Sequence, residues 1–318
     1  MVIGGVNLVN VFCAPGARNF DGNGYWHSRY SNWTGSTFVA KTTTVEPRMD
    51  PEKGRGNMRL NPRTLQPVDF LPSCIKVYPR SQSTLNSVGL SGPGLKDLLD
   101  RGFWQTWEKP FMISVAPESK EPADIITELG IFSRMLLKEL PRFLSPVVVI
   151  LNVTCPNIGH GQKNIITEGL AGLEALSPLR LPIFLNLNVL VDPSVAYMFS
   201  QNPVCRGLFL TNSIPFGRMP ERIPWEKLFG KTSPLQKFGG GGLSGPMLLP
   251  IVEDWLINFR KNYSPFFPVI AGGGVFSPED GLRLCKAGAS GIFIGTMSMH
   301  RPWRVQPTIQ AVNDYFRR

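Results

Sequence analysis

The sequence of 318 residues predicts a single α/β domain, numbered 1–318, that folds as a (β/α)8 TIM barrel. Short, nearly unbroken apolar runs recur along the chain, and several of them end in small or polar residues. Strands that are buried on both faces of a parallel sheet have this composition. Segments with helical spacing alternate with the runs from about residue 111 to the end, which indicates βα units. Eight such runs favour a closed barrel over an open sheet.

The expected strands are these apolar runs, at residues 9–14, 38–41, 111–116, 147–154, 183–189, 207–211, 268–271 and 291–295. Helices are expected at 123–140 and 247–263, where apolar residues recur at helical spacing. Two more helices should begin at Asp192 and Ser277, because each can cap a helix and is followed by proline. Gly288 is the expected stop of the second of these.

Residues 44–110 interrupt the alternation of strands and helices and are rich in proline and glycine. We therefore expect a long, extended insertion over the mouth of the barrel. Residues 1–17 are apolar and uncharged but lack the basic start of a signal peptide, so we interpret them as part of the fold.

The composition restricts the possible partners. The net charge is +10, but lysine and arginine are dispersed without a run of five, which argues against nucleic acid and favours small anionic ligands. The five cysteines are odd in number and form no C-x-x-C pair, so we expect no disulfide framework, no metal site and a reducing compartment. No apolar run reaches about 18 residues, the length of a membrane-spanning helix, so no membrane partner is expected.

Glycines follow the last two expected strands. The glycines at 272–274 follow the seventh strand, and Gly295 and Thr296 follow the eighth. Backbone N–H groups of such loops can approach a phosphate closely, and these two loops are the usual phosphate site of a TIM barrel. A further glycine run at 239–242 leads to Gly245 and is interpreted either as a flexible loop or as a backbone wall for the same ligand.

The fourth expected strand ends in a loop in which Asn152 and Asn157 flank Cys155. Asparagine amides both donate and accept hydrogen bonds, which suits a planar heterocycle with carbonyl and N–H edges. A free cysteine at a strand end can act as a nucleophile or carry a proton, but it can equally be a small buried apolar residue. His160 is close in sequence, so a Cys–His pair is possible although nothing else indicates it.

Lys41 ends the second expected strand. A lysine inside a barrel mouth is costly unless it faces an anion, so it points to a ligand there; the alternative is a surface lysine. Asn86 with Ser87, and Asn212 with Ser213, are turn formers when each pair is taken alone. Together with the other asparagines at strand ends, they predict one amide-lined pocket.

In this order along nearly the whole chain, the motifs resemble the dihydroorotate dehydrogenases, specifically their soluble class 1 branch. The matching segments are 6–12, 14–16, 41–48, 56–57, 86–90, 152–157, 211–213, 242–245, 273–274 and 295–296. The resemblance implies an N-terminal hairpin, bound FMN and oxidation of dihydroorotate to orotate in pyrimidine biosynthesis. It also implies a cytoplasmic homodimer, with fumarate as the expected electron acceptor, whereas NAD would require a partner subunit.

The resemblance also implies roles for individual residues. Cys155 would be the catalytic base that removes a proton from C5 while hydride leaves C6 for flavin N5. Substrate-binding residues would be Lys41, Asn86, Gly89, Leu90, Asn152, Asn157, Asn212 and Ser213. FMN would contact Ala14, Gly16, Lys41, Thr42, Asn152, Asn186 and Thr211 around its ring, and Gly245, Gly273, Gly274, Gly295 and Thr296 around its phosphate.

Three features depart from the family pattern. Asn186 stands where the family has a lysine against the flavin, Val88 stands where many class 1 members have methionine, and residues 44–62 are longer than usual. The lost positive charge predicts a lower flavin reduction potential with slower turnover, or a changed substrate. The alternatives are an FMN oxidoreductase for another pyrimidine-like substrate, similar to the pyrimidine-reducing domain of dihydropyrimidine dehydrogenase, and a non-catalytic flavin-binding paralogue.

Overall fold

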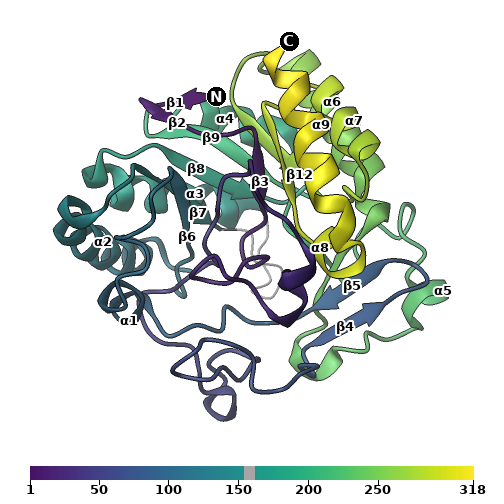
Figure 1. Ribbon diagram of the computed structural model, residues 1–318, viewed down its shortest axis with the longest axis horizontal. Helices are drawn as coiled ribbons and strands as arrows, with labels where there is room; N and C mark the ends of the chain where they lie inside the picture. The colour runs from purple at the N-terminus through teal and green to yellow at the C-terminus, as the bar shows by residue number, and fades with distance from the viewer. Residues whose placement is uncertain (154–161) are drawn as a thin grey trace.

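A computed structural model describes residues 1–153 and 162–318, and its centre is a curled, seven-stranded parallel sheet (Figure 1). The order of the strands in the sheet is β3-β13-β12-β9-β8-β7-β6. Each strand overlaps one of the expected runs: β3 (Val11–Cys13), β6 (Phe111–Val115), β7 (Val147–Asn152), β8 (Ile183–Leu187), β9 (Cys205–Leu210), β12 (Val269–Gly272) and β13 (Gly291–Ile294).

Residues 37–43 lie between the two edge strands of this sheet. Thr37 forms a parallel bridge with β3, and Val39 and Thr43 form parallel bridges with β6. The expected strand at 38–41 is therefore an extended segment with isolated bridges rather than a regular strand. Part of the reason is that the N–H of Lys41 leaves the sheet and donates to the carbonyl of Asn19 at 2.9 Å. The continuous sheet has seven strands instead of the expected eight.

Helices cover the outside of the sheet, with α2 and α3 on one flank and α6, α7 and α9 on the other (Figure 1). The helices are α1 (Leu95–Asp100), α2 (Pro122–Glu139), α3 (Gln162–Leu176), α4 (Pro193–Ser200), α5 (Trp225–Phe229), α6 (Leu249–Asn262), α7 (Pro278–Lys286), α8 (Met297–His300) and α9 (Val305–Arg317). Two expected caps are confirmed. Asp192 accepts from the N–H of Ser194 at the start of α4, and Ser277 accepts from the N–H of Asp280 at the start of α7.

The core continues inside the curl of the sheet, where aromatic side chains from several strands meet. Phe209 of β9 stacks on Phe293 of β13 with ring centroids 4.5 Å apart, and it meets Phe12 of β3 edge-to-face at 6.2 Å. All three side chains are nearly inaccessible to solvent. Because this packing fills the interior, the ends of the strands are left as the places where polar groups can gather.

The chain begins with the expected hairpin, in which β1 (Val2–Ile3) pairs antiparallel with β2 (Val6–Asn7). The expectation for residues 44–110 was only partly right, because this segment contains α1 and a second hairpin, β4 (Ile75–Tyr78) and β5 (Ser83–Asn86). These strands extend a small antiparallel sheet with β10 (Ile214–Pro215) and β11 (Gly242–Ser244), in the order β10-β11-β5-β4. The glycine run near 242 thus ends in a strand rather than in a flexible loop.

In the described part of the chain, no helix combines the length and the apolar composition that crossing a membrane needs.

Candidate functional site

A hydrogen-bonded series of polar side chains links β6, β7, the segment 37–43 and the turn that follows β9. The amide of Asn212 donates to the Oδ1 of Asn152 at 3.2 Å, and the amide of Asn152 approaches the Oγ1 of Thr42 at 3.4 Å. The hydroxyl of Thr42 in turn lies 2.8 Å from that of Ser114 on β6. Three of these side chains, on Thr42, Ser114 and Asn152, are buried. The structure therefore brings together Thr42, Asn152 and Asn212 as expected. It adds Ser114, which the sequence did not single out because it stands within an apolar run.

Asn186 lies in register with Asn152, on the next strand of the sheet. Its side chain is 4% exposed, so it belongs to the interior of the site rather than to its rim. A neutral amide therefore stands at the position where the resemblance implies a lysine. The structure offers no charged substitute on the same strand, because the rest of β8 is apolar.

Asn188 holds the turn that follows β9, although the sequence had not singled it out as a site residue. Its amide donates to the carbonyls of Asn212 at 3.2 Å and Ser213 at 2.8 Å. Thr211 is fixed as well, because its hydroxyl accepts a hydrogen bond from the backbone N–H of Val189 at 2.8 Å. The signal was present in the sequence: Asn186 and Asn188 are two positions apart, the spacing that puts side chains on one side of a strand.

Lys41 is buried at the mouth, with only 7% of its surface exposed. Its ammonium donates to the carbonyl of Ser91 and lies 4.8 Å from the centre of the Phe20 ring. Gly16 lies beside its aliphatic stem, since a Cβ at that glycine would come 3.6 Å from the Cγ of Lys41. The alternative of an ordinary surface lysine is therefore wrong, and Ser91 and Phe20 are its neighbours that sequence reasoning missed.

The residues that follow β5 form a turn that contacts Lys41 and the end of β6. Asn86 is the last residue of β5, and its amide approaches the carbonyl of Gly242 at 3.5 Å. Gly89 and Leu90 both adopt positive φ, +68° and +58°, which makes the turn tight. Leu90 packs against Ala116 at the end of β6, and the next residue provides the carbonyl that binds Lys41. The structure thus places Leu90 at the end of β6 and Asn86 beside Gly242 of β11. A place for Gly89 in the substrate site remains a prediction.

The glycine loops after β12 and β13 present backbone N–H groups at the strand ends. In the described part of the chain, the N–H groups of Gly273, Gly274, Gly295 and Thr296 bond to no carbonyl outside the regular strands and helices. Because β12 and β13 are paired neighbours, these donors belong to one edge of the sheet. Ala14 adjoins them, since a Cβ at Gly295 would lie 3.1 Å from that of Ala14. Donors on two adjacent strand ends fit a phosphate.

Gly245 lies at the end of β11 rather than on the parallel sheet. A Cβ there would come 2.9 Å from the hydroxyl oxygen of Ser83 on β5, so the close packing of two strands already requires glycine. Its place near a phosphate remains a prediction.

Cys155 and Asn157 lie outside the described residues. The four described cysteines, Cys13, Cys74, Cys205 and Cys285, are free thiols. Burial raises the pKa of each of them, to about 11 for Cys13 and Cys74 and to about 12 for Cys205 and Cys285. None of these four is a thiolate at neutral pH, so none is suited to proton transfer.

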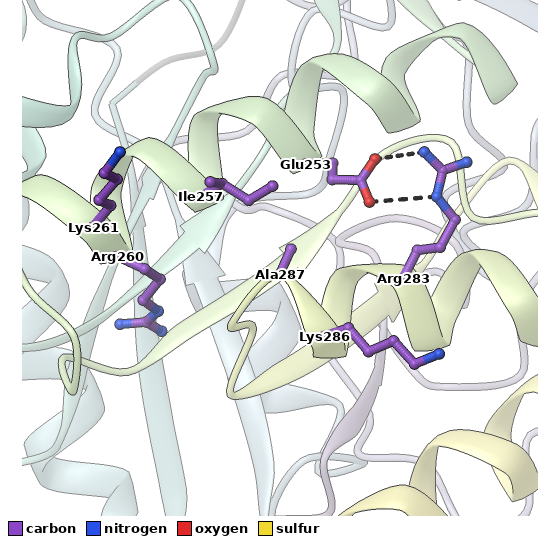
Figure 2. A pocket seen from close by; sticks show the side chains of 7 residues that line it. All are labelled: Glu253, Ile257, Arg260, Lys261, Arg283, Lys286 and Ala287. Carbon is purple, nitrogen blue, oxygen red and sulfur yellow. Dashed lines mark hydrogen bonds and ion pairs between the residues drawn. The ribbon is translucent and has the colours of Figure 1, made fainter.

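A groove of about 530 Å³ lies on the helical surface between α6 and α7 (Figure 2). In it, Glu253 forms an ion pair with Arg283, and Arg260 donates to the carbonyls of Gly288 and Phe267. Its arginines already have partners, and none of the expected site residues lines it. We therefore place the candidate site at the strand ends and not in this groove.

Comparisons with known proteins agree with the resemblance found in the sequence. A sequence model described as dihydroorotate dehydrogenase matches residues 226–314. The catalytic subunit of dihydroorotate dehydrogenase B (NAD(+)) from Caldicellulosiruptor bescii is 27% identical over 258 residues, 78% of this chain and 76% of the relative. A putative dihydroorotate dehydrogenase A (fumarate) from Aquifex aeolicus is 25% identical over 241 residues, 73% of this chain and 72% of the relative.

A solved structure shows the same fold. The crystal structure of dihydroorotate dehydrogenase from Eimeria tenella in complex with ferulenol superposes with a TM-score of 0.64 at 15% identity. The superposition covers 97% of this chain and 81% of that chain. The low identity limits the comparison to architecture.

Proposed function

We infer that this chain, a divergent relative of the dihydroorotate dehydrogenases, is an FMN-dependent oxidoreductase that acts on a CH–CH bond and converts dihydroorotate to orotate. The observation that carries this inference is the hydrogen-bonded series from Ser114 through Thr42 and Asn152 to Asn212, beside the buried ammonium of Lys41. We propose that residues 37–43 act as the second strand of a closed eight-stranded barrel that carries this site.

The described residues fit FMN. The N–H groups of Gly273, Gly274, Gly295 and Thr296 suit its phosphate, with Gly245 nearby, because they bond to no carbonyl outside the regular strands and helices among the described residues. Backbone donors at strand ends can bind oxyanions. Residues proposed around its ring are Ala14, Gly16, Lys41, Thr42, Asn152, Asn186 and Thr211. When bound, FMN supplies the acceptor of a hydride.

The asparagines and Lys41 suit a pyrimidine carboxylate. An ammonium that is almost wholly buried gains most from an anion, because the surroundings screen charge weakly. Amide groups that are already fixed by hydrogen bonds, such as those of Asn152 and Asn212, can match carbonyl and N–H edges without reorganising. We propose that Asn86, Gly89, Leu90, Asn157 and Ser213 complete the substrate contacts.

We propose Cys155 as the base. Oxidation of dihydroorotate removes a proton from C5 and a hydride from C6, and leaves a C5–C6 double bond in orotate. The thiolate of Cys155 would take the C5 proton, since a thiol titrates nearer to neutral pH than a hydroxyl does.

The test is a comparison of Cys155→Ala and Cys155→Ser with the unmodified enzyme in an assay of orotate formation. We expect both variants to keep their flavin. Cys155→Ala should lose activity by about a hundredfold or more, the usual contribution of a general base. Cys155→Ser should regain activity as the pH rises. Equal rates for Cys155→Ala and the unmodified enzyme would remove Cys155 from this role.

Asn186 favours a second candidate function. Without the positive charge that the resemblance implies at position 186, the site is suited equally to another pyrimidine-like substrate, or to flavin binding without turnover. Flavin that stays oxidised with dihydroorotate but is reduced by another dihydropyrimidine would support the first of these.

The electron acceptor and assembly are also proposals. We propose fumarate as the acceptor and a cytoplasmic homodimer as the assembly. The curated relatives include both a fumarate type and an NAD(+) type. Orotate formation with fumarate and the chain alone would support the first type, whereas activity only with an added NAD-dependent subunit would support the second.

A further inference from the structure

A second cavity lies away from the proposed flavin site, beside the connection that follows β3. Its volume is about 730 Å³, within the range of ligand sites, and it lies between residues 18–36 and 106–109. None of the residues proposed to hold FMN or dihydroorotate lines it. It is therefore separate from the site described above.

Arg18 lines this cavity and is surrounded by aromatic rings. Its guanidinium carbon lies 5.4 Å from the ring centre of Phe38, 5.8 Å from that of Trp107 and 5.9 Å from that of Trp33. These contacts use the faces of the rings and stabilise the cation by electrostatic attraction. They fix the position of the guanidinium but give its N–H groups no acceptor.

The N–H groups of Arg18 donate no hydrogen bond to any described residue, although the side chain is half-buried. Asp21 is a carboxylate that acts on it electrostatically, but both oxygens of Asp21 accept hydrogen bonds from Asn23. Burial lowers the pKa of Arg18, with the charge of Asp21 opposing this effect. A guanidinium carries five donors in a fixed fork, so its unused edge is matched to an oxyanion.

Other arginines of this chain show how such a side chain is normally satisfied. Arg260 donates to three backbone carbonyls, and Arg101 donates to Asp97 and to the carbonyls of Pro62 and Arg63. Both use the N–H edges that Arg18 leaves open. The difference points to a ligand and not merely to packing.

Further donors surround the same cavity. Lys109, an exposed residue, also lines it, and Glu108 is the one acidic residue of the lining. The indole N–H of Trp33, a residue 9% exposed, and the hydroxyl of Ser31 are buried without a hydrogen-bond partner among the described residues. Buried polar groups without partners are rare, and their concentration here is a second sign of a missing acceptor.

We propose that this cavity is a binding site for a small ligand that carries an oxyanion, either a carboxylate or a phosphate. The fork of Arg18 binds the oxyanion, Lys109 adds a second positive charge, and Trp33 and Trp107 form apolar walls for the rest of the ligand. The net charge of +10 favours the approach of anions.

The test is calorimetric titration at low ionic strength with two probes, inorganic phosphate and benzoate, which separate the two sources of the oxyanion. The proteins are the unmodified chain, Arg18→Gln, Lys109→Gln and the matched control Arg134→Gln, whose arginine is exposed on α2. We expect Arg18→Gln to weaken binding by about tenfold or more, as loss of a charge-assisted hydrogen bond does. Lys109→Gln should weaken it by about two- to fivefold, and Arg134→Gln should not change it.

Two results would overturn the proposal. One is no binding of either probe to the unmodified chain. The other is equal binding by the unmodified chain, Arg18→Gln and Lys109→Gln, which would assign any phosphate binding to the glycine loops after β12 and β13. Lys109→Gln keeps the aromatic contacts of Arg18, so it tests the site even if Arg18→Gln does not fold.

Discussion

Asn186 places a neutral amide in register with Asn152, on a strand that otherwise buries only apolar side chains. The position could be read from the sequence, because the asparagine interrupts an apolar run. Its alignment with Asn152 could not be read from the sequence, because the register of neighbouring strands depends on contacts between distant parts of the chain. We therefore predict that a flavin bound at this site lacks the electrostatic support of a charged residue at position 186.

The substitution Asn186→Lys should strengthen that support. A charge-assisted interaction with the reduced flavin contributes on the order of 1–3 kcal/mol, so we expect reduction by dihydroorotate to become about tenfold faster and the flavin potential to rise. Anaerobic stopped-flow absorbance measures the rate, and Asn186→Gln, which stays neutral, is the control. Equal rates for Asn186→Lys and Asn186→Gln would show that charge at this position does not limit the reaction.

Glu168 is another buried polar residue that pattern analysis did not single out. It lies on α3 with 2% of its surface exposed, and burial raises its pKa from 4.5 to about 7, with Lys120 opposing this effect. The folded state binds this proton more tightly than the unfolded state does. The contribution of Glu168 to the stability of the fold is therefore fully present below about pH 4.5 and is lost as the pH rises through about 7.

The substitution Glu168→Gln should remove this pH dependence. The free energy of unfolding is measured with urea at about pH 5 and about pH 8. Its fall between these two pH values should be smaller in the variant than in the unmodified chain, by up to about 3 kcal/mol, because a pKa difference of one unit corresponds to about 1.4 kcal/mol. Glu174→Gln, on the exposed side of the same helix, should behave like the unmodified chain. The same pH dependence in all three proteins would contradict this role of Glu168.

At the scale of elements, local patterns predicted what local interactions determine. The starts of α4 and α7 follow from caps that lie next to the helices they begin, and the buried parallel strands follow from unbroken apolar runs. The antiparallel sheet could not be predicted, because β5 pairs with β11 across more than a hundred residues of chain. The same long-range pairing brings Asn86 beside Gly242.

Gly274 shows that a glycine loop can have two physical causes. It has a φ of +84°, and an added Cβ would collide with the backbone of Leu249 at the start of α6. Gly274→Ala should therefore destabilise the fold by about 2–4 kcal/mol through strain and overpacking, and should lower flavin content.

The matched control is Gly217→Ala. Gly217 has a nearly equal φ of +83° but nothing within 4 Å of the added Cβ, so this substitution should cost only about 1 kcal/mol of backbone strain. Urea denaturation and flavin absorbance measure the two effects. If the two variants are equally stable, close packing at Gly274 is not what requires glycine.

At the scale of the whole molecule, the chain directs its polar groups to the ends of the strands while aromatic packing fills the interior. Strand and helix alternation could predict this arrangement, and the order of the motifs along the chain could predict the resemblance to the dihydroorotate dehydrogenases that the comparisons also find. The isolated bridges of residues 37–43 could not be predicted, because they depend on the competing contact between Lys41 and Asn19. The positive charge of the molecule agrees with ligands that all carry anionic groups.

The central claim is that the strand ends hold FMN and pass electrons to it from dihydroorotate. The most direct measurement is the visible absorbance of the purified protein during an anaerobic titration with dihydroorotate. The account predicts a yellow protein with about one flavin per chain that bleaches as orotate forms, and a Cys155→Ala variant that bleaches more slowly by about a hundredfold or more. A colourless protein that does not take up FMN, or a yellow one that dihydroorotate does not bleach, would contradict it.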